Sequence, residues 1–122
     1  MAKDDDRFIF PGYIDDKELI WLYKNAHLNI LVSYDEGFGL SYIEAASQKT
    51  PSLLSNIDIF REIAQDNAFF ADPENYKDIA EKINTLSDDI NLRNTIGEEA
   101  YERSKHFSQD SFKYEFEKAI FE

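Results

Sequence analysis

Residues 33–40 form the stretch of this 122-residue chain that is best suited to bind a ligand. They read Ser-Tyr-Asp-Glu-Gly-Phe-Gly-Leu and directly follow a short apolar run that ends at Val32. Gly37 and Gly39 allow the backbone to turn sharply and to bring its N–H groups close to a ligand. A helix is expected directly after them, and the unpaired N–H groups of its first turn favour an anion. The sequence therefore predicts an anion-binding loop at this place.

Two carboxylates accompany this loop. Glu36 lies within it, and Glu44 lies one and a half turns into the expected helix, about 7 Å from the helix start. Carboxylates accept hydrogen bonds from sugar hydroxyls, so the layout fits a phosphate-bearing ligand with hydroxyl groups at both ends. The spacing alone leaves a second interpretation open, in which the loop is an ordinary connection and Glu44 is a solvated helix residue.

The elements that must position these residues follow from the hydrophobic pattern. Several residues in each of four short runs are apolar at consecutive positions, which is typical of strands covered on both faces. Segments with helical periodicity lie between and after these runs. Strands alternating with helices predict a parallel sheet with right-handed crossovers, hence a three-layer α/β/α fold with about four mainly parallel strands. The expected strands are residues 8–10, 28–32, 52–54 and 68–71.

Helix boundaries are indicated by capping residues. Asp15 begins a capping box, and Asp72, followed by Pro73, predicts a second helix start. Ser87 predicts a third start, and Gly97 is expected to be a weak point inside the helix that follows. Helices are also expected over about residues 39–49 and 57–65 and after Ser108. Trp21, Phe69, Phe70 and Phe107 are core candidates, and His27 and His106 are interpreted as structural residues.

Composition excludes several classes of protein. The net charge of −12 argues against a nucleic-acid binder, since the phosphate backbone favours clustered cations. The absence of cysteine excludes disulfides, thiolate nucleophiles and thiolate-bound metals. No apolar run approaches the ~18 residues of a membrane span, and no secretory signal is readable. We expect a disordered, charged start at residues 1–7 and a single domain at residues 8–122.

The loop and its surroundings resemble the E-x7-E motif of retaining glycosyltransferases of the family 4 type, which have the GT-B fold. Residues 33–46 read S-Y-D-E-G-F-G-L-S-Y-I-E-A-A, with Glu36 and Glu44 at the two motif positions. Further segments are similar to other family motifs, and the resemblance extends from residue 8 to the end of the chain. These segments are residues 10–23, Thr50-Pro51, Asp72-Pro73 and Phe107-Ser108.

The resemblance implies a role for each residue of the site. Glu36 corresponds to the glutamate that holds the donor sugar and stabilises the oxocarbenium-like transition state. Glu44 corresponds to the glutamate that hydrogen-bonds the nucleotide ribose. The donor is a nucleotide-sugar such as a UDP- or GDP-sugar, and neither a cofactor nor a metal is expected. The backbone N–H groups that meet the sugar and diphosphate correspond to Gly37, Phe38, Gly39 and Leu40.

The resemblance also implies which parts of such an enzyme this sequence does not contain. GT-B enzymes have two Rossmann-like domains, and this chain resembles only the second half of the second, donor-binding domain. Its expected partners are therefore an N-terminal acceptor domain and the first half of the donor domain, which carries an Arg and a Lys for the diphosphate. We expect a fragment, inactive alone, of a cytoplasmic enzyme of polysaccharide biosynthesis, with peripheral placement at the inner face of the membrane as a further option. Such an enzyme transfers a sugar to a glycan or lipid with retention.

Three positions depart from the family pattern. Ala46 and Lys49 stand where the family usually has Met and Gly, and Val32 stands where it usually has Pro. None of the three lies in the loop itself.

Other interpretations remain at this point. A non-catalytic binding or assembly module of the same ancestry is the alternative function, while a receiver-like signalling domain is disfavoured because no acidic pair follows the first strand. Residues 8–10 either pair directly beside residues 28–32 or leave an open sheet edge that recruits another chain. A homo-oligomer is expected through that edge or through the apolar stripe Phe112, Phe116 and Ile120.

Overall fold

A three-stranded parallel sheet organises the computed structural model, which describes residues 5–32 and 40–107. The strands are β1 (Asn29–Leu31), β2 (Ser52–Ser55) and β3 (Phe69–Ala71), in the spatial order β1-β2-β3. Ile30 is in register with Leu53, and Leu53 with Phe69. All four residues of β2 are buried, as expected of a central strand with helices on both faces. The predicted three-layer α/β/α class is confirmed, with three strands in the described part of the chain.

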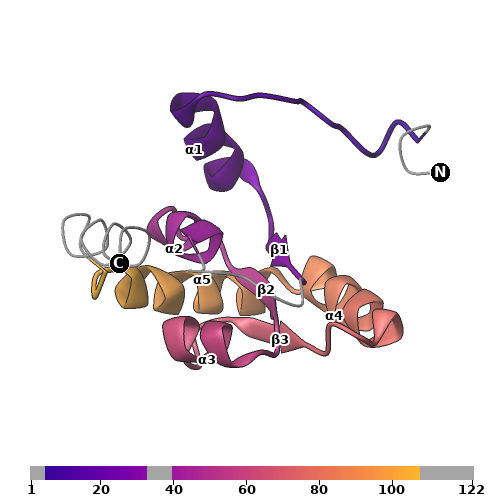
Figure 1. The fold of residues 1–122 in the computed structure, drawn as a ribbon, viewed down its shortest axis with the longest axis vertical. Helices are drawn as coiled ribbons and strands as arrows, with labels where there is room; N and C mark the ends of the chain where they lie inside the picture. The colour runs from indigo at the N-terminus through magenta and orange to yellow at the C-terminus, as the bar shows by residue number, and fades with distance from the viewer. Residues whose placement is uncertain (1–4, 33–39, 108–122) are drawn as a thin grey trace, which may run out of the picture.

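Five helices connect and flank the strands in the described residues (Figure 1). α5 packs against both α2 and α4, and α1 packs against α2. Along the chain, α2 begins at Leu40, directly after the residues 33–39 that carry most of the predicted site. The helices are α1 (Asp16–Asn25), α2 (Leu40–Ser47), α3 (Asp58–Ala64), α4 (Tyr76–Asp88) and α5 (Ile90–Ser104).

The core lies between α2, β2, α3 and α5. Phe70 and Phe107 pack against it, in agreement with their prediction as core residues. Trp21 does not, since 62% of its surface is exposed and α1 has no buried residue. The core residues are Tyr42, Ile43, Ala46, Leu54, Phe60, Ala64, Ala68 and Ala100.

Residues 8–10 do not form the predicted first strand. Phe8, Ile9 and Phe10 are 53%, 83% and 68% exposed and belong to an extended segment that runs apart from the sheet (Figure 1). A strand needs a neighbouring strand to satisfy its N–H and C=O groups, and within the described residues β1 pairs only with β2. Of the two alternatives for residues 8–10, pairing beside residues 28–32 is therefore wrong. Of the start expected to be disordered, residues 1–4 lie outside the described residues.

Two of the three predicted helix starts need correction. Asp15 caps α1 as expected, because its carboxylate accepts a hydrogen bond from the N–H of Glu18 at 2.8 Å. The Asp72 carboxylate instead accepts from the N–H of Glu74 in a turn, so α4 begins later, with Asn75 as its N-cap. Ser87 lies inside α4, and the cap of α5 is Asp89, which accepts from the N–H of Leu92 at 2.9 Å.

Gly97, expected to be a weak point of its helix, is buried in α5 at a close packing position. A Cβ added there would lie 2.4 Å from the carbonyl oxygen of Lys49, which belongs to the turn after α2. In that turn the N–H of Thr50 donates to the carbonyl of Ala45 and the N–H of Lys49 to that of Ala46, the pattern of a Schellman motif. Glycine at position 97 therefore allows α5 to approach the end of α2 closely. The predicted helix after Ser108, with its apolar stripe, lies outside the described residues.

Candidate functional site

The described part of the candidate site begins at the first residue of α2. Leu40 starts this helix and is half-buried, which agrees with the helix expected directly after the loop. The other four loop residues with a predicted role lie outside the described residues, so their roles stay predictions. These are Glu36, Gly37, Phe38 and Gly39.

Glu44 faces α1 from the middle of α2. Its side chain is half-buried, and its Oε2 accepts a hydrogen bond from the hydroxyl of Tyr23 at 3.1 Å. The two residues, together with Asp16, Ser47 and others, line a hollow of about 350 Å³ between the two helices. Glu44 is thus not a freely solvated helix residue: it has a fixed neighbour and still faces an open space.

Tyr23 belongs to a polar network that joins four elements. Its hydroxyl oxygen lies 3.2 Å from the Oγ of Ser41 in α2. Ser41 donates to the side-chain oxygen of Asn29 in β1 at 3.3 Å, and the amide nitrogen of Asn29 donates to the hydroxyl of Ser52 in β2 at 3.0 Å. The backbone carbonyl of Tyr23 also accepts a hydrogen bond from the hydroxyl of Thr50. These contacts fix both ends of the tyrosine.

The environment of Tyr23 keeps its hydroxyl protonated. Burial raises the pKa of this phenol, the neighbouring hydroxyl of Ser41 lowers the pKa, and the negative charge of Glu44 raises it further. A raised pKa favours the neutral form, which carries the proton that the phenol donates to Glu44. The hydroxyl is therefore a hydrogen-bond donor at neutral pH.

The sequence did not identify Tyr23 as part of the site. Its spacing with Leu19 and Leu22 places it on the apolar face of α1, where a tyrosine is interpreted as a core residue. The available signal was its hydroxyl, which needs a polar partner when the ring is buried.

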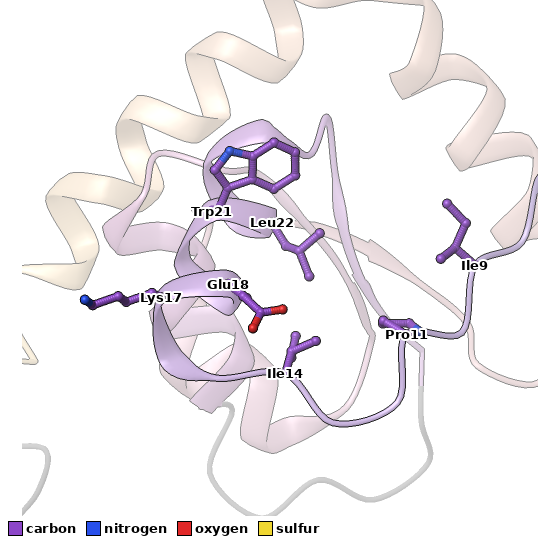
Figure 2. Close-up of a pocket in the computed structure, with 7 residues that line it drawn as sticks. All are labelled: Ile9, Pro11, Ile14, Lys17, Glu18, Trp21 and Leu22. Atoms are coloured by element: carbon purple, nitrogen blue, oxygen red, sulfur yellow. The ribbon is translucent and has the colours of Figure 1, made fainter.

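A larger hollow lies on the far side of α1. It measures about 650 Å³ and is lined mainly by apolar side chains. In Figure 2, Ile9 and Pro11 of the extended segment lie on one side of it, and Trp21 and Leu22 of α1 lie on the other. Its one cation and one carboxylate, Lys17 and Glu18, form no arrangement suited to catalysis, so we place the candidate site at Glu44.

Residues 5–32 and 40–107 contain neither a metal-binding cluster nor a membrane-spanning helix. No cluster of three or more His, Asp or Glu side chains in these residues could hold a metal ion. None of the described helices combines the length and the apolar character needed to cross a membrane.

Comparison with known proteins identifies the family. Residues 3–103 match the family described as "Glycosyl transferases group 1". The serotype-specific mannosyltransferase WbdA of Escherichia coli is 41% identical over 70 residues, which cover 57% of this chain and 9% of that protein. O-antigen chain mannosyltransferase B of Escherichia coli is 31% identical over 102 residues, which cover 84% of this chain and 27% of that protein. The chain thus spans only a small part of the length of these relatives.

Solved structures show the same fold. The sucrose-phosphate synthase of Thermosynechococcus elongatus superimposes with a TM-score of 0.79 and 24% identity over 95% of this chain and 31% of that one. The C-terminal domain of the group 1 glycosyltransferase LpcC of Francisella tularensis gives a TM-score of 0.73 and 28% identity over 84% of this chain and 54% of that one. With the family match over residues 3–103 and a shared architecture, this chain belongs to the group 1 glycosyltransferases.

Proposed function

We propose that this chain is the donor-nucleotide-binding part of a retaining glycosyltransferase. Such an enzyme moves a sugar from a nucleotide-sugar to a glycan or lipid acceptor. The observation that carries the proposal is the family match over residues 3–103, which includes an E-x7-E spacing whose second glutamate is held beside an open hollow.

Each site residue has a chemical role in this proposal. The carboxylate of Glu44 accepts hydrogen bonds from the ribose hydroxyls of the donor. The backbone N–H groups of the loop, at Gly37, Phe38, Gly39 and Leu40, face the sugar and the diphosphate. Glu36 lies beside the sugar, where its negative charge stabilises the positive charge that develops as the glycosidic bond breaks.

The donor is a nucleotide-mannose in this proposal. Relatives named as mannosyltransferases match 57% to 84% of this chain at 31% to 41% identity. A guanosine diphosphate sugar is one of the two donor classes that the motif implies, so GDP-mannose is the probe of choice. No metal is required, because cationic side chains and the helix end neutralise the leaving diphosphate in enzymes of this fold.

We propose further that the 122-residue chain does not catalyse transfer by itself. The loop contains no lysine or arginine, and the net charge of −12 opposes a diphosphate. Without cations from other segments, affinity for the donor is expected to be millimolar, about −4 kcal/mol, or weaker.

The test is a titration of the chain with GDP-mannose, followed by NMR. We expect weak, saturable shifts centred on α2 and the preceding loop, and further loss of affinity in Glu44→Ala. Lys77→Ala, on the exposed side of α4, is the control and leaves the titration unchanged. Micromolar binding would contradict the proposed need for other segments. Shifts that avoid α2 altogether would contradict the proposed site.

A second candidate function, a non-catalytic binding or assembly module, is favoured by one observation. Large apolar side chains, among them Phe8, Ile9, Phe10 and Tyr13, are exposed on the segment before α1 and are available to a protein partner. Absence of any shift at nucleotide-sugar concentrations well above the millimolar range would favour this second function.

A further inference from the structure

Tyr23 and Glu44 form a pair that links α1 to α2. We propose that Tyr23 is a positioning residue, which holds the Glu44 carboxylate in the orientation needed to bind the vicinal diol of a nucleotide ribose. This inference rests on the proposed function. It adds Tyr23, a residue to which neither the motif nor the relatives assign a role, and it explains how the site would select a ribose.

The two oxygens of the Glu44 carboxylate have different surroundings. Oε2 of Glu44 accepts the hydrogen bond from Tyr23 at 3.1 Å. Within the part of the chain that the structure describes, Oε1 has no hydrogen-bond partner, and the side chain borders the hollow of about 350 Å³. One oxygen is therefore anchored while the other stays available, and each carboxylate oxygen can accept more than one hydrogen bond.

Tyr23 is itself fixed strongly enough to act as an anchor. Its carbonyl accepts from Thr50, its hydroxyl lies against Ser41, and Ser41 is bonded to Asn29 of the sheet. The position of its hydroxyl is thus set by β1 and β2 as well as by its own helix. A freely rotating glutamate would lose side-chain entropy on binding a diol, and an anchored one has already lost it.

Selectivity for ribose follows from this arrangement. The diol is the part of the nucleotide that the carboxylate recognises, so an anchored Glu44 favours a ribonucleotide over its dideoxy analogue. Loss of the Tyr23 hydroxyl should reduce this preference without affecting contacts made to the phosphates. A purely structural role of Tyr23 would instead weaken binding of both nucleotides together.

The experiment compares GDP with 2′,3′-dideoxy-GDP, each titrated by NMR into the chain and into Tyr23→Phe. We expect Tyr23→Phe to bind GDP about three- to tenfold more weakly, as for loss of one hydrogen bond, and to bind the dideoxy nucleotide as before. Tyr76→Phe is the control, because Tyr76 is 76% exposed in α4 and should leave both affinities unchanged. An unchanged preference for GDP in Tyr23→Phe overturns the inference, as does equal weakening of both nucleotides.

A second measurement tests the pair without any ligand. The pKa of Tyr23 is followed by NMR of the labelled phenol in the chain and in Glu44→Gln. Removing the negative charge should lower this pKa, since Glu44 raises it. An unchanged Tyr23 pKa overturns the pairing. If the unaltered chain binds GDP and its dideoxy analogue equally, the proposed ribose role of Glu44 is wrong. The pH titration of Tyr23 still tests the Tyr23–Glu44 pair in that case.

Discussion

The two glutamates of the site are expected to affect different kinetic constants. In the proposed function Glu44 contacts the ribose, which is bound alike in the ground state and the transition state, so Glu44→Ala should mainly raise the donor KM. The proposed role of Glu36 is to act on charge that develops at the sugar, so Glu36→Ala should mainly lower kcat. The measurement is steady-state kinetics of a complete group 1 glycosyltransferase that carries this segment. Equal effects of both variants on both constants would contradict this division of roles.

The position of Glu44 could be predicted from the sequence, but its neighbour could not. Motif spacing places Glu44 one and a half turns into a helix that follows a glycine-containing stretch, and α2 begins where that spacing requires. The contact with Tyr23 joins residues 21 positions apart and depends on how α1 crosses α2, which no local pattern encodes. The charges and the helical period of the sequence identify the polar and apolar faces of each helix. Only tertiary packing decides which of these helix faces are in contact.

At the scale of elements, the turn after α2 contains an unfavourable backbone conformation. Lys49 has φ of 63° at the C′ position of the Schellman motif, where glycine is preferred. A non-glycine residue in this conformation costs about 1–2 kcal/mol, and glycine costs about 0.5–1 kcal/mol in additional chain entropy. Lys49→Gly is therefore expected to raise the free energy of unfolding by about 0.5–1 kcal/mol, measured by urea unfolding.

The matched control for this change is Lys49→Ala. Both variants remove the ion pair of Lys49 with Glu98, whose N···O distance is 3.5 Å, and the contact of Lys49 with the ring of Tyr101. Both groups of the ion pair are more than half exposed, so its contribution is small. Only Lys49→Gly relieves the backbone. The interpretation fails if the alanine variant is as stable as the glycine variant.

A second prediction at the scale of elements concerns Gly97 of α5, which lies against the same turn. Alanine has the higher helix propensity by about 1 kcal/mol, but its Cβ would lie 2.4 Å from a backbone oxygen that cannot rotate away. Overpacking of this kind costs about 1–3 kcal/mol, so Gly97→Ala should lower the free energy of unfolding. Asn94→Ala, at an exposed position of α5, controls for helix propensity and should be neutral or stabilising. An increase in the urea midpoint of Gly97→Ala would show that α5 can move away from Lys49.

Sequence patterns predicted strands best where the helices that cover them and the strands that pair with them lie in the same stretch of chain. β1 and β3 fall within the predicted runs and β2 extends one residue beyond its run, to Ser55, because their covering helices follow in the same stretch. Residues 8–10 have the same apolar pattern and form no strand, since pairing depends on a neighbour that the pattern does not reveal. Helix starts moved from Asp72 and Ser87 to Asn75 and Asp89 because several capping residues lie close together and only one of them fits the geometry.

At the scale of the molecule, the described residues are markedly asymmetric in their exposed apolar surface. Most of the large apolar side chains that are exposed in the described residues lie before residue 31. Among them, Ile9, Trp21 and Leu22 line the hollow of about 650 Å³ (Figure 2). Ile30 lies on β1, whose outer edge has no partner strand within the described residues. We call this surface the N-terminal apolar surface. It comprises Phe8, Ile9, Phe10, Tyr13, Ile20, Trp21, Leu22 and Ile30.

Self-association of the isolated chain through this surface is the expected consequence. Burial of each large apolar side chain is worth roughly 1.5–3 kcal/mol. The net charge of −12 opposes association, but repulsion between exposed charges is screened beyond about 8–10 Å at physiological salt. Sedimentation at tens of micromolar should therefore show a dimer or larger assembly. The double variant Ile9→Asn with Trp21→Gln keeps the net charge and should shift the chain towards monomer, whereas Tyr76→Gln, outside the N-terminal apolar surface, should not. A monomeric unaltered chain under these conditions would show that this surface does not drive association.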